Sequence, residues 1–405
     1  MTEKRLGRAA GLPPTNAADA DSEFAIVYFS GTDWDATWQR PQQLASRLTR
    51  HGQVLYVNSF GLRVPSLKDL GRIGRRIGAS INRRVRPLPH SALTIISPLL
   101  FLPFPSNRLA NRINGWLLRR PLDRWIKRQG SRNLVLWIGI PSPGAMESIK
   151  GLAPGLLVYD CIDNVAAFHR NRPDIIETEQ RVASTAGVVI ATSAELFEKM
   201  KRINPNTFLV PNAVNFEQFR AAAEHPLAPP RDMTQLKRPI LGYVGEIAEW
   251  FDCDLIHDLA LQNPGGSIVL IGGIHADISK ILQLPNVHYL GLKGYGDIPG
   301  YMSQFDVCLL PFKVNSLTNA VNPIKFYEYL AMGKPVVSTP IREIRPYREL
   351  VEVADPSGFA AAVKRALLEA GDERRIDQRI QIAQNNTWDT RTAEIIRILR
   401  LSIGT

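Results

Sequence analysis

The sequence has little cysteine and no long apolar run. It contains three cysteines in 405 residues, and they are far apart and form no C-x-x-C pair. This spacing excludes a disulfide framework, argues against a zinc site and fits a reducing compartment. The stretch that comes nearest to a spanning helix, residues 93–105, is broken by three prolines. It is also shorter than the about 20 residues that a transmembrane helix needs.

Two targeting and cofactor patterns are also missing. Residues 1–22 have no apolar core after their basic residues, so we expect a disordered tail and not a secretory signal. Neither of the two strand patterns that would open a nucleotide-binding domain is followed by G-x-G-x-x-G, because the sequence reads FSGTDW and YVGEIA at these places. A nicotinamide dehydrogenase is therefore the least favoured activity, and we expect no cofactor.

Positive charge is concentrated in two segments. The net charge is +11, and residues 61–90 and 107–132 each carry eight Lys or Arg against one Asp. Apolar residues recur at helical spacing in both segments. Basic amphipathic helices suit an anionic membrane surface, which is the partner we expect. The alternatives are a solvated face, core packing or a nucleic acid, but the chain has no nucleic-acid-binding motif, so we expect no nucleic-acid partner.

Strand and helix patterns alternate along the chain in two series. This alternation predicts an α/β fold of two Rossmann-like domains facing across a cleft. We expect an N-terminal domain at 23–210, a C-terminal domain at 211–385, and a last helix at 386–405 that packs back toward the N-terminal domain. The strand patterns lie at residues 23–30, 53–59, 93–97, 133–139, 155–160, 187–193 and 208–212, and then at 239–246, 267–273, 287–291, 306–312 and 335–339.

The stretch NPIKFYEYLAMGKPVVSTP, residues 322–340, combines a short helix with a buried strand. Asn322 is a suitable N-cap and Pro323 suits the first helical position. The N–H groups at such a helix start form an anion site, and Lys325 lies in the same turn. Glu328 follows one turn later, where a carboxylate can accept two hydrogen bonds from vicinal hydroxyls, as on a ribose. The plain alternative is a solvated helix face.

The order of buried strand, loop, short helix and GKPVV turn resembles the donor-binding half of family 4 glycosyltransferases, which have the two-domain GT-B fold. The stretches 181–196, 208–219 and 286–312 also look like this family. WQRPQQLASRL and YDCIDN resemble a branch associated with teichuronic acid and exopolysaccharide synthesis. The resemblance implies a nucleotide-sugar donor held by the C-terminal domain, an acceptor held by the N-terminal domain, retention at the anomeric carbon and no metal. It assigns the ribose to Glu328.

Two departures from the family pattern affect the donor site. Ala320 stands where the family usually has a second glutamate. The loop after the first strand of the C-terminal domain reads GEIAEWFDCD, where the family usually has Arg or Lys for the diphosphate. We expect Gly245 and Glu246 of this loop to lie against the donor. Lys325, Lys313 or Arg40 would supply the missing positive charge, and Thr318 and Asn319 would contact sugar hydroxyls.

Candidate groups for the reacting centre lie in two loops of the N-terminal domain. In GTDWDATWQRP, residues 31–41, Gly31 permits close approach of a ligand and Arg40 is near a helix start, while Trp38 faces the cleft or only packs. In YDCIDN, Asp160 and Asp163 stand where the resemblance places a cleft residue beside the reacting sugar. A carboxylate there would orient the acceptor hydroxyl or stabilise positive charge, and the alternative is helix capping.

Two other features suggest chemistry that we do not expect. Asp252-Cys253-Asp254 spells D-x-D, the metal motif of another glycosyltransferase fold, but it precedes a helical pattern. Asp252 is therefore expected to be an N-cap, and no metal is expected. His169 is the only histidine near a candidate site, and we expect it to be a loop or surface residue.

These observations favour a glycosyltransferase that moves a sugar from a nucleotide-sugar to a glycan or lipid-linked acceptor in cell-surface polysaccharide synthesis. The expected location is the cytoplasm, at the inner face of the plasma membrane. Two alternatives stay open on the sequence. One is a nucleotide-sugar epimerase on the same fold. The other is a non-catalytic, membrane-associated scaffold of a polysaccharide assembly complex, which Ala320 and the acidic loop would explain.

Overall fold

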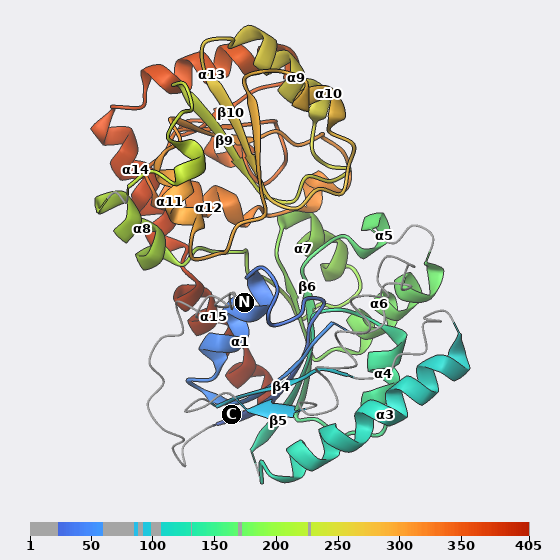
Figure 1. The fold of residues 1–405 in the computed structure, drawn as a ribbon. Helices are drawn as coiled ribbons and strands as arrows, with labels where there is room; N and C mark the ends of the chain where they lie inside the picture. Colours follow the sequence, from blue (N-terminus) through green and yellow to red (C-terminus); the bar gives the residue numbers. More distant parts are fainter. Residues whose placement is uncertain are drawn as a thin grey trace, which may run out of the picture. The chain divides into compact units, whose positions relative to one another are not determined.

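The chain folds into two compact units (Figure 1). The first unit holds the described residues up to Pro211 together with those from Arg391 on, and the second holds Asn212–Thr390. The border therefore falls between Pro211 and Asn212 and again inside the last helix. The structure is a computed structural model that describes residues 23–59, 85–87, 92–98, 107–130, 132–168, 172–225 and 228–404.

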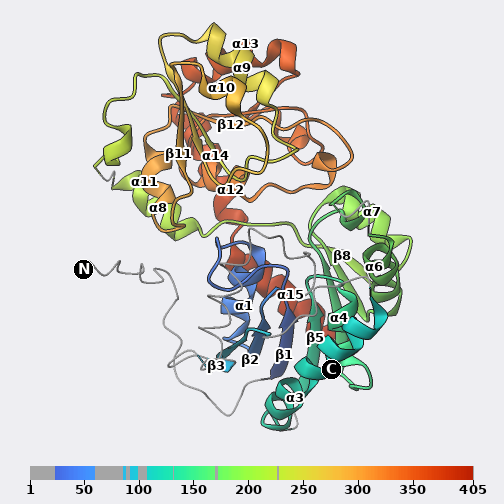
Figure 2. The same ribbon diagram turned by 45° about the vertical axis from the view of Figure 1, so that its right-hand side comes forward.

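A mostly parallel sheet forms the centre of the first unit, and Figure 2 shows its strands β1, β2 and β5 side by side. Strand β1, FAIVYF, is buried at all six positions, as expected for a parallel strand covered on both faces. Among the described strands of this sheet, β3 alone pairs in antiparallel fashion, with β4. The order is β3 (Val85–Pro87), β4 (Leu93–Ile96), β2 (Gly52–Val57), β1 (Phe24–Phe29), β5 (Asn133–Ile138), β6 (Leu156–Cys161), β7 (Val188–Ala191), β8 (Thr207–Leu209).

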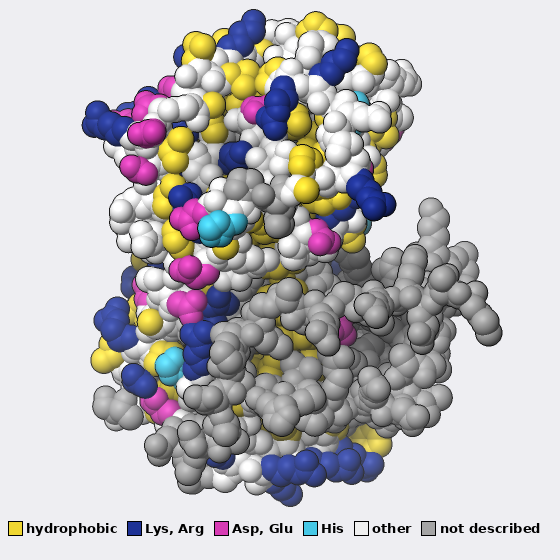
Figure 3. Space-filling view, turned by 60° about the vertical axis from the view of Figure 1, so that its left-hand side comes forward, with side chains coloured by type: hydrophobic (Ala, Val, Ile, Leu, Met, Phe, Trp, Pro, Cys, Tyr) yellow, Lys and Arg dark blue, Asp and Glu magenta, His cyan; other side chains and the backbone are white. Residues whose placement is uncertain are grey.

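The helices of the first unit begin at polar caps or at proline. The side chains of Asn107, Ser142 and Ser193 accept hydrogen bonds from backbone N–H groups at the starts of α3, α4 and α7. Figure 3 shows a row of Lys and Arg side chains along the lowest edge of this unit. The helices are α1 (Arg40–Leu48), α3 (Arg108–Lys127), α4 (Pro143–Ile149), α5 (Val165–Phe168), α6 (Pro173–Thr185) and α7 (Ala194–Lys201).

The second unit has a parallel sheet in which the strand order reverses beside β9. Strand β10 pairs with one edge of β9 and β12 with the other. Ligands of open α/β sheets bind at the carboxyl ends of the strands at such a reversal. The order is β11 (Val287–Gly291), β10 (Ser267–Ile271), β9 (Ile240–Val244), β12 (Val307–Leu310), β13 (Val336–Ser338), β14 (Glu352–Val353). The helices are α8 (Phe216–Glu224), α9 (Cys253–Gln262), α10 (Ser279–Leu282), α11 (Ile298–Ser303), α12 (Ile324–Ala331), α13 (Phe359–Leu368) and α14 (Glu373–Asn385).

The last helix, α15 (Trp388–Ile403), belongs to both units. Its first residue, Trp388, is fully buried, and its backbone N–H donates to the carbonyl of Val214 in the second unit. Near its other end, Arg400 forms an ion pair with Glu23 at 2.8 Å within the first unit. No helix in the described part of the chain is both long enough and apolar enough to cross a membrane.

Candidate functional site

The segment from β12 to β13 forms one side of the strand reversal in the second unit. Strand β12 ends at Leu310, a loop follows, and α12 begins at Ile324. The helix ends where Gly333 adopts a φ of 68°, a left-handed conformation that glycine takes at little cost. The chain then enters the buried strand β13. The short helix, glycine turn and buried strand expected for residues 322–340 are all present.

Glu328 is a buried carboxylate with one oxygen available. Its side chain is 1% exposed, and Oε2 accepts a hydrogen bond from Lys325 Nζ at 2.6 Å. Oε1 is enclosed and makes no hydrogen bond. Burial raises the pKa of Glu328, while the nearby Lys325 and Tyr295 lower it. A buried oxygen without a partner carries a cost of about 1–3 kcal/mol, which a ligand hydroxyl would remove.

The start of α12 differs from the expected cap. Pro323 is the N-cap, and no side chain caps the helix. The expectation that Asn322 caps it is wrong, because the Asn322 side chain is occupied elsewhere. Its Oδ1 accepts from the Asn212 backbone N–H at 3.0 Å, and its Nδ2 donates to Glu343 Oε2 at 2.8 Å. Asn322 therefore holds the first residue of the second unit and does not present its side chain to a donor.

The loop before α12 uses its polar side chains internally. Thr318 is 1% exposed, and its hydroxyl donates to the Lys313 carbonyl at 2.5 Å. Asn319 Oδ1 accepts from the Arg342 backbone N–H at 3.1 Å. These bonds shape the loop, so the expectation that Thr318 and Asn319 contact sugar hydroxyls has no support in this geometry. Ala320 is fully buried in the same turn.

The loops after β9, β10 and β12 are joined to one another by backbone hydrogen bonds. The N–H of Ile247 donates to the Gly273 carbonyl at 2.8 Å, and the N–H of Lys313 donates to the Trp250 carbonyl at 2.8 Å. A Cβ on Gly272 would lie 1.8 Å from the carbonyl oxygen of Gly245, so this approach requires glycine. These contacts hold the loop 245–254 in place.

The charges at the tips of these loops are mixed. Glu246 Oε2 lies 2.9 Å from Nε2 of His275, which follows β10, and both side chains are partly exposed. Sequence reasoning did not single out His275, because no pattern in the chain marks it. Lys313 is exposed at the end of β12. The Lys325 ammonium lies 5.8 Å from the centre of the Tyr295 ring and pairs with Glu328.

The D-x-D sequence is the start of a helix, as expected. Asp252 is the N-cap of α9, and its Oδ1 accepts from the Leu255 N–H at 3.0 Å. Asp254 forms an ion pair with Lys280 at 2.8 Å on the surface. Within the described ranges, no three His, Cys, Asp or Glu side chains converge as a metal site requires.

Replacing Asp252 with alanine is expected to lower the free energy of unfolding of the second unit by about 1 kcal/mol, because the N–H of Leu255 loses its acceptor. Chemical denaturation measures the change, and Asp254→Ala, at the exposed neighbouring position, is the control with an expected change within about 0.5 kcal/mol. Any ligand binding or activity of the second unit should persist in both variants. Loss of activity on Asp252→Ala with unchanged stability would instead support a ligand role.

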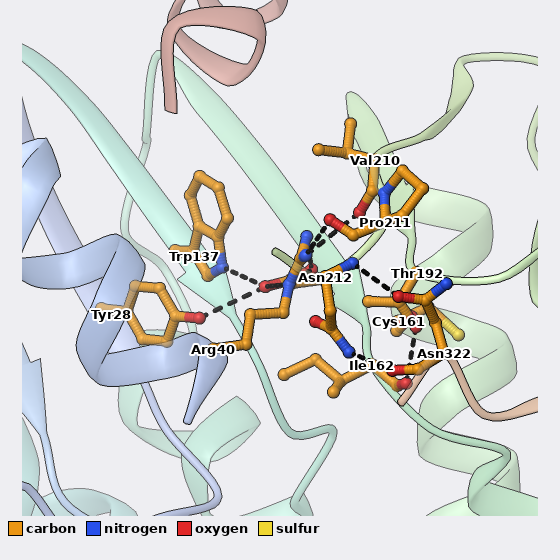
Figure 4. A network of polar contacts seen from close by, with 11 residues as sticks. Tyr28, Arg40, Trp137, Cys161, Ile162, Thr192, Val210, Pro211, Asn212 and Asn322 are labelled. Carbon is orange, nitrogen blue, oxygen red and sulfur yellow. Dashed lines mark hydrogen bonds and ion pairs between the residues drawn. The ribbon is translucent and has the colours of Figure 1, made fainter. Parts of the chain in front are cut away.

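In the first unit, Arg40 and Asp160 form a fully enclosed ion pair (Figure 4). Their side chains are 1% and 0% exposed, and Arg40 Nη2 lies 2.9 Å from Asp160 Oδ1. Tyr28 Oη and Trp137 Nε1 donate to Asp160 Oδ2 at 3.2 and 3.3 Å. Arg40 Nη1 donates to the carbonyl of Val210 at 3.0 Å and to that of the following residue at 3.3 Å.

This geometry corrects the role expected for Arg40 and Asp160. Both were expected at the reacting centre, and the structure brings them together, but their charged groups face each other in the interior. Asp160 lies near the end of β6 and Arg40 at the start of α1, so the pair links the sheet to this helix. Because Arg40 also binds the carbonyls of Val210 and Pro211, the pair fixes the last residues of the first unit.

Asp163 is the exposed carboxylate among the three candidates in this unit. It follows β6, and its carboxyl group is close enough to that of Asp160 for the two charges to interact. Burial and, second, the charge of Asp160 raise the pKa of Asp163 to about 6. Because the side chain also reaches solvent, water screens part of this effect.

The loop after β1 packs closely on its surroundings. A Cβ on Gly31 would lie 3.0 Å from Cδ1 of Ile140, which follows β5. Trp38 is half-buried, and its ring meets that of the buried Trp34 edge to face at 5.5 Å. Packing therefore accounts for Trp34, while Trp38 keeps an accessible surface. His169 lies outside the described residues, as does most of the basic segment 61–90.

Sequence comparison identifies glycosyltransferases as relatives of this chain. Residues 238–369 match the family model described as glycosyl transferases, group 1. The chain is also 30% identical over 285 residues to TuaH of Bacillus subtilis (strain 168), which is named as a teichuronic acid biosynthesis glycosyltransferase. This match covers 65% of the chain and 70% of TuaH.

Solved structures with the same fold cover almost the whole chain. Sucrose-phosphate synthase from Thermosynechococcus elongatus has a TM-score of 0.67 at 17% identity and covers 93% of this chain and 98% of its own. Anabaena Alr3699/HepE, solved with UDP and glucose, has a TM-score of 0.60 at 15% identity, with 93% and 99% covered. WaaG, involved in lipopolysaccharide biosynthesis, has a TM-score of 0.61 at 12% identity, with 92% and 99% covered.

Proposed function

Because the chain belongs to the group 1 glycosyl transferases and has the GT-B fold, we propose that it transfers a sugar from a nucleotide-sugar to a glycan or lipid-linked acceptor. The observation that carries the donor half of this proposal is Glu328. It is a buried carboxylate with one unbonded oxygen, on the helix that follows the strand reversal of the second unit. Such an oxygen suits a hydroxyl donor of a ligand, for example a ribose hydroxyl.

The neighbouring positive charge supports a diphosphate beside that ribose. The first turn of α12 has no side-chain cap, and the Phe326 N–H donates to the Pro323 carbonyl at 3.2 Å, so the N–H groups of Ile324 and Lys325 are the ones that would face an anion. Lys325 lies in that turn, and Lys313 is exposed on the preceding loop. We propose that these two lysines take the place of the basic side chains that the loop 245–254 lacks. Gly245 and Glu246 of that loop would lie against the donor.

The proposed reaction breaks the bond between the anomeric carbon and the diphosphate oxygen, with retention of configuration. The acceptor oxygen forms the new bond to that carbon, and its proton passes to the leaving diphosphate. The contribution of the protein is the positioning of the donor and the stabilisation of negative charge on the leaving diphosphate. In the first unit, Asp163 is our candidate for orienting the acceptor hydroxyl, since Asp160 and Arg40 are enclosed. The proposal requires no metal.

The proposed pathway is the synthesis of a cell-surface polysaccharide, on the cytoplasmic side of the membrane. The support is the 30% identity to TuaH, whose name refers to teichuronic acid biosynthesis. The acceptor is tested separately, by offering glycans and lipid-linked sugars together with the matching nucleotide-sugar.

Thermal unfolding with UDP, GDP, ADP and NAD tests the donor site. A ligand at about 100 times its dissociation constant adds roughly 2.7 kcal/mol, which raises the melting temperature by a few degrees. We expect one nucleoside diphosphate to stabilise the wild type and to stabilise Glu328→Ala less. No shift with any nucleotide at millimolar concentration would contradict the enzyme proposal and favour a scaffold. With the matching nucleotide-sugar, its conversion to an epimeric nucleotide-sugar without an acceptor would favour an epimerase.

A further inference from the structure

Helix α3 presents one face to the protein and leaves the other to solvent. It packs on α4, as Figures 1 and 2 both show. A Cβ on Gly115 would lie 2.7 Å from Cβ of Glu147 on α4, so glycine permits this close contact. Leu118, Leu122 and Trp125 lie on the same inner face and are at most 8% exposed. The inner face thus holds α3 firmly on the first unit and determines which side chains point outward.

The outward face of the first half of α3 is mainly apolar, and the exposed Arg108 and Arg112 lie beside it. Leu109 is 64% exposed, Ile113 38%, Trp116 56% and Leu117 40%. These residues are spaced by three and four along the helix, so they lie on one face. Large apolar side chains gathered on one exposed face cost free energy in water and mark an interaction surface. The guanidinium group of Arg120 lies 4.6 Å from the centre of the Trp116 ring.

The outward face of the second half of α3 is basic. Arg120, Arg124, Lys127 and Arg128 are exposed there, and the acidic Asp123 is paired with Arg119 at 2.7 Å. Residues 108–128 contain seven Lys or Arg and one acidic residue.

We propose that α3 lies flat on an anionic lipid surface, with its first half inserted and its second half bound to phosphate headgroups. An amphipathic helix with apolar side chains on one part of its face and Lys or Arg beside them suits the interface of a bilayer. Trp116 suits the headgroup level, because its indole has an apolar ring and an N–H donor. Each basic side chain near an anionic surface adds to the attraction.

Two other partners fit this surface less well. A nucleic acid would match the basic half, but it offers little to Leu109, Ile113 and Leu117, which would stay in water. A second copy of the chain would match the apolar half, but a contact through that half would leave the basic half of α3 without negative charge to bind. The inference extends the proposed function, since a lipid-linked acceptor would be present at such a surface, but its test does not depend on the nucleotide site.

Co-sedimentation with lipid vesicles tests the proposal with two α3 variants. We expect the wild type to bind vesicles of phosphatidylcholine mixed with phosphatidylglycerol and not vesicles of phosphatidylcholine alone. Arg124→Gln with Lys127→Gln and Arg128→Gln is expected to weaken binding about a hundredfold and to reduce its salt dependence. Trp116→Ser with Leu117→Ser is expected to weaken it at least about tenfold.

A matched control separates α3 from the positive charge of the whole chain. Lys237→Gln with Lys364→Gln and Arg374→Gln removes three exposed charges from the second unit and should bind vesicles as the wild type does. Equal loss in this control, no binding to anionic vesicles, or equal binding of double-stranded DNA would overturn the proposal. So would a dimer that Trp116→Ser abolishes. Each variant should keep the melting temperature of the wild type and the rise in that temperature with nucleotide. This result distinguishes a failure of the membrane proposal from a failure of the donor-site proposal.

Discussion

Replacing Glu328 with glutamine is expected to weaken binding of the preferred nucleoside diphosphate about tenfold to a hundredfold. The ionised carboxylate accepts stronger hydrogen bonds than a neutral amide oxygen, and a bond to a charged group contributes about 1.5–3 kcal/mol. Glutamine also places a donor where one of two hydroxyl donors would bind. Isothermal titration with the nucleotide measures the dissociation constant. Glu349→Gln, at an exposed position of the same unit, is the control and should bind as the wild type does.

Glu328→Gln is also expected to leave the second unit at least as stable at neutral pH as it is in the wild type. Burial raises the pKa of Glu328 above its ordinary value of 4.5, so ionising this carboxyl group costs more free energy in the folded protein than in the unfolded chain. The free-energy cost of the ionised group is therefore absent below about pH 4.5 and develops as the pH rises through the folded pKa. Glutamine removes this cost, and Lys325 offsets part of it in the wild type.

Denaturation at several pH values measures this difference in stability. We expect the stability of Glu328→Gln relative to the wild type to be greatest near neutral pH and to decrease toward low pH. A variant that is less stable and binds nucleotide normally would contradict both the buried-charge account and the ribose role. Residues at binding sites often lower the stability of the free protein, because a group that binds a ligand has an incomplete set of hydrogen-bond partners until the ligand is bound.

Replacing Asp160 with alanine is expected to destabilise the first unit by about 3–5 kcal/mol. Removing one partner of a buried ion pair leaves the other charge enclosed without compensation. Arg40 would be that charge, and Tyr28 and Trp137 would lose a common acceptor. Glu177→Ala is the matched control, since it removes an exposed carboxylate of the same unit and should change stability by about 0.5 kcal/mol or less.

Tryptophan fluorescence in denaturant is suited to this measurement. Five of the seven tryptophans precede residue 212, so the signal comes mainly from the first unit. Binding of nucleotide by the second unit should be unchanged, because Asp160 contacts no residue of that unit in the bonds described. The double variant Arg40→Met with Asp160→Leu should be less destabilised than Asp160→Ala. Normal stability of Asp160→Ala with lost transfer would restore the catalytic role first expected from the sequence.

Local patterns in the sequence were sufficient for the features that depend on neighbouring residues. The helix, glycine turn and buried strand of 322–340 and the N-cap role of Asp252 depend on residues a few positions apart, which the sequence displays directly. The doubly wound organisation follows from the alternation of apolar strand patterns with amphipathic helices. The position of Glu328 was predicted on the same basis, but its burial and its unbonded oxygen were not.

Contacts between distant residues decided the rest. Arg40 and Asp160 are 120 positions apart, and each alone has the residue type and loop position of a catalytic group. Only the packing of α1 on the sheet shows that their charges neutralise each other. Asn322 resembled a cap, but Asn212, 110 positions away, takes its side chain. Hydrogen bonds and charges act through space, so a polar residue's role depends on partners that the order of the chain does not reveal. The apolar pattern of the chain determined which elements form, and the tertiary structure determined which polar groups remain available to a ligand.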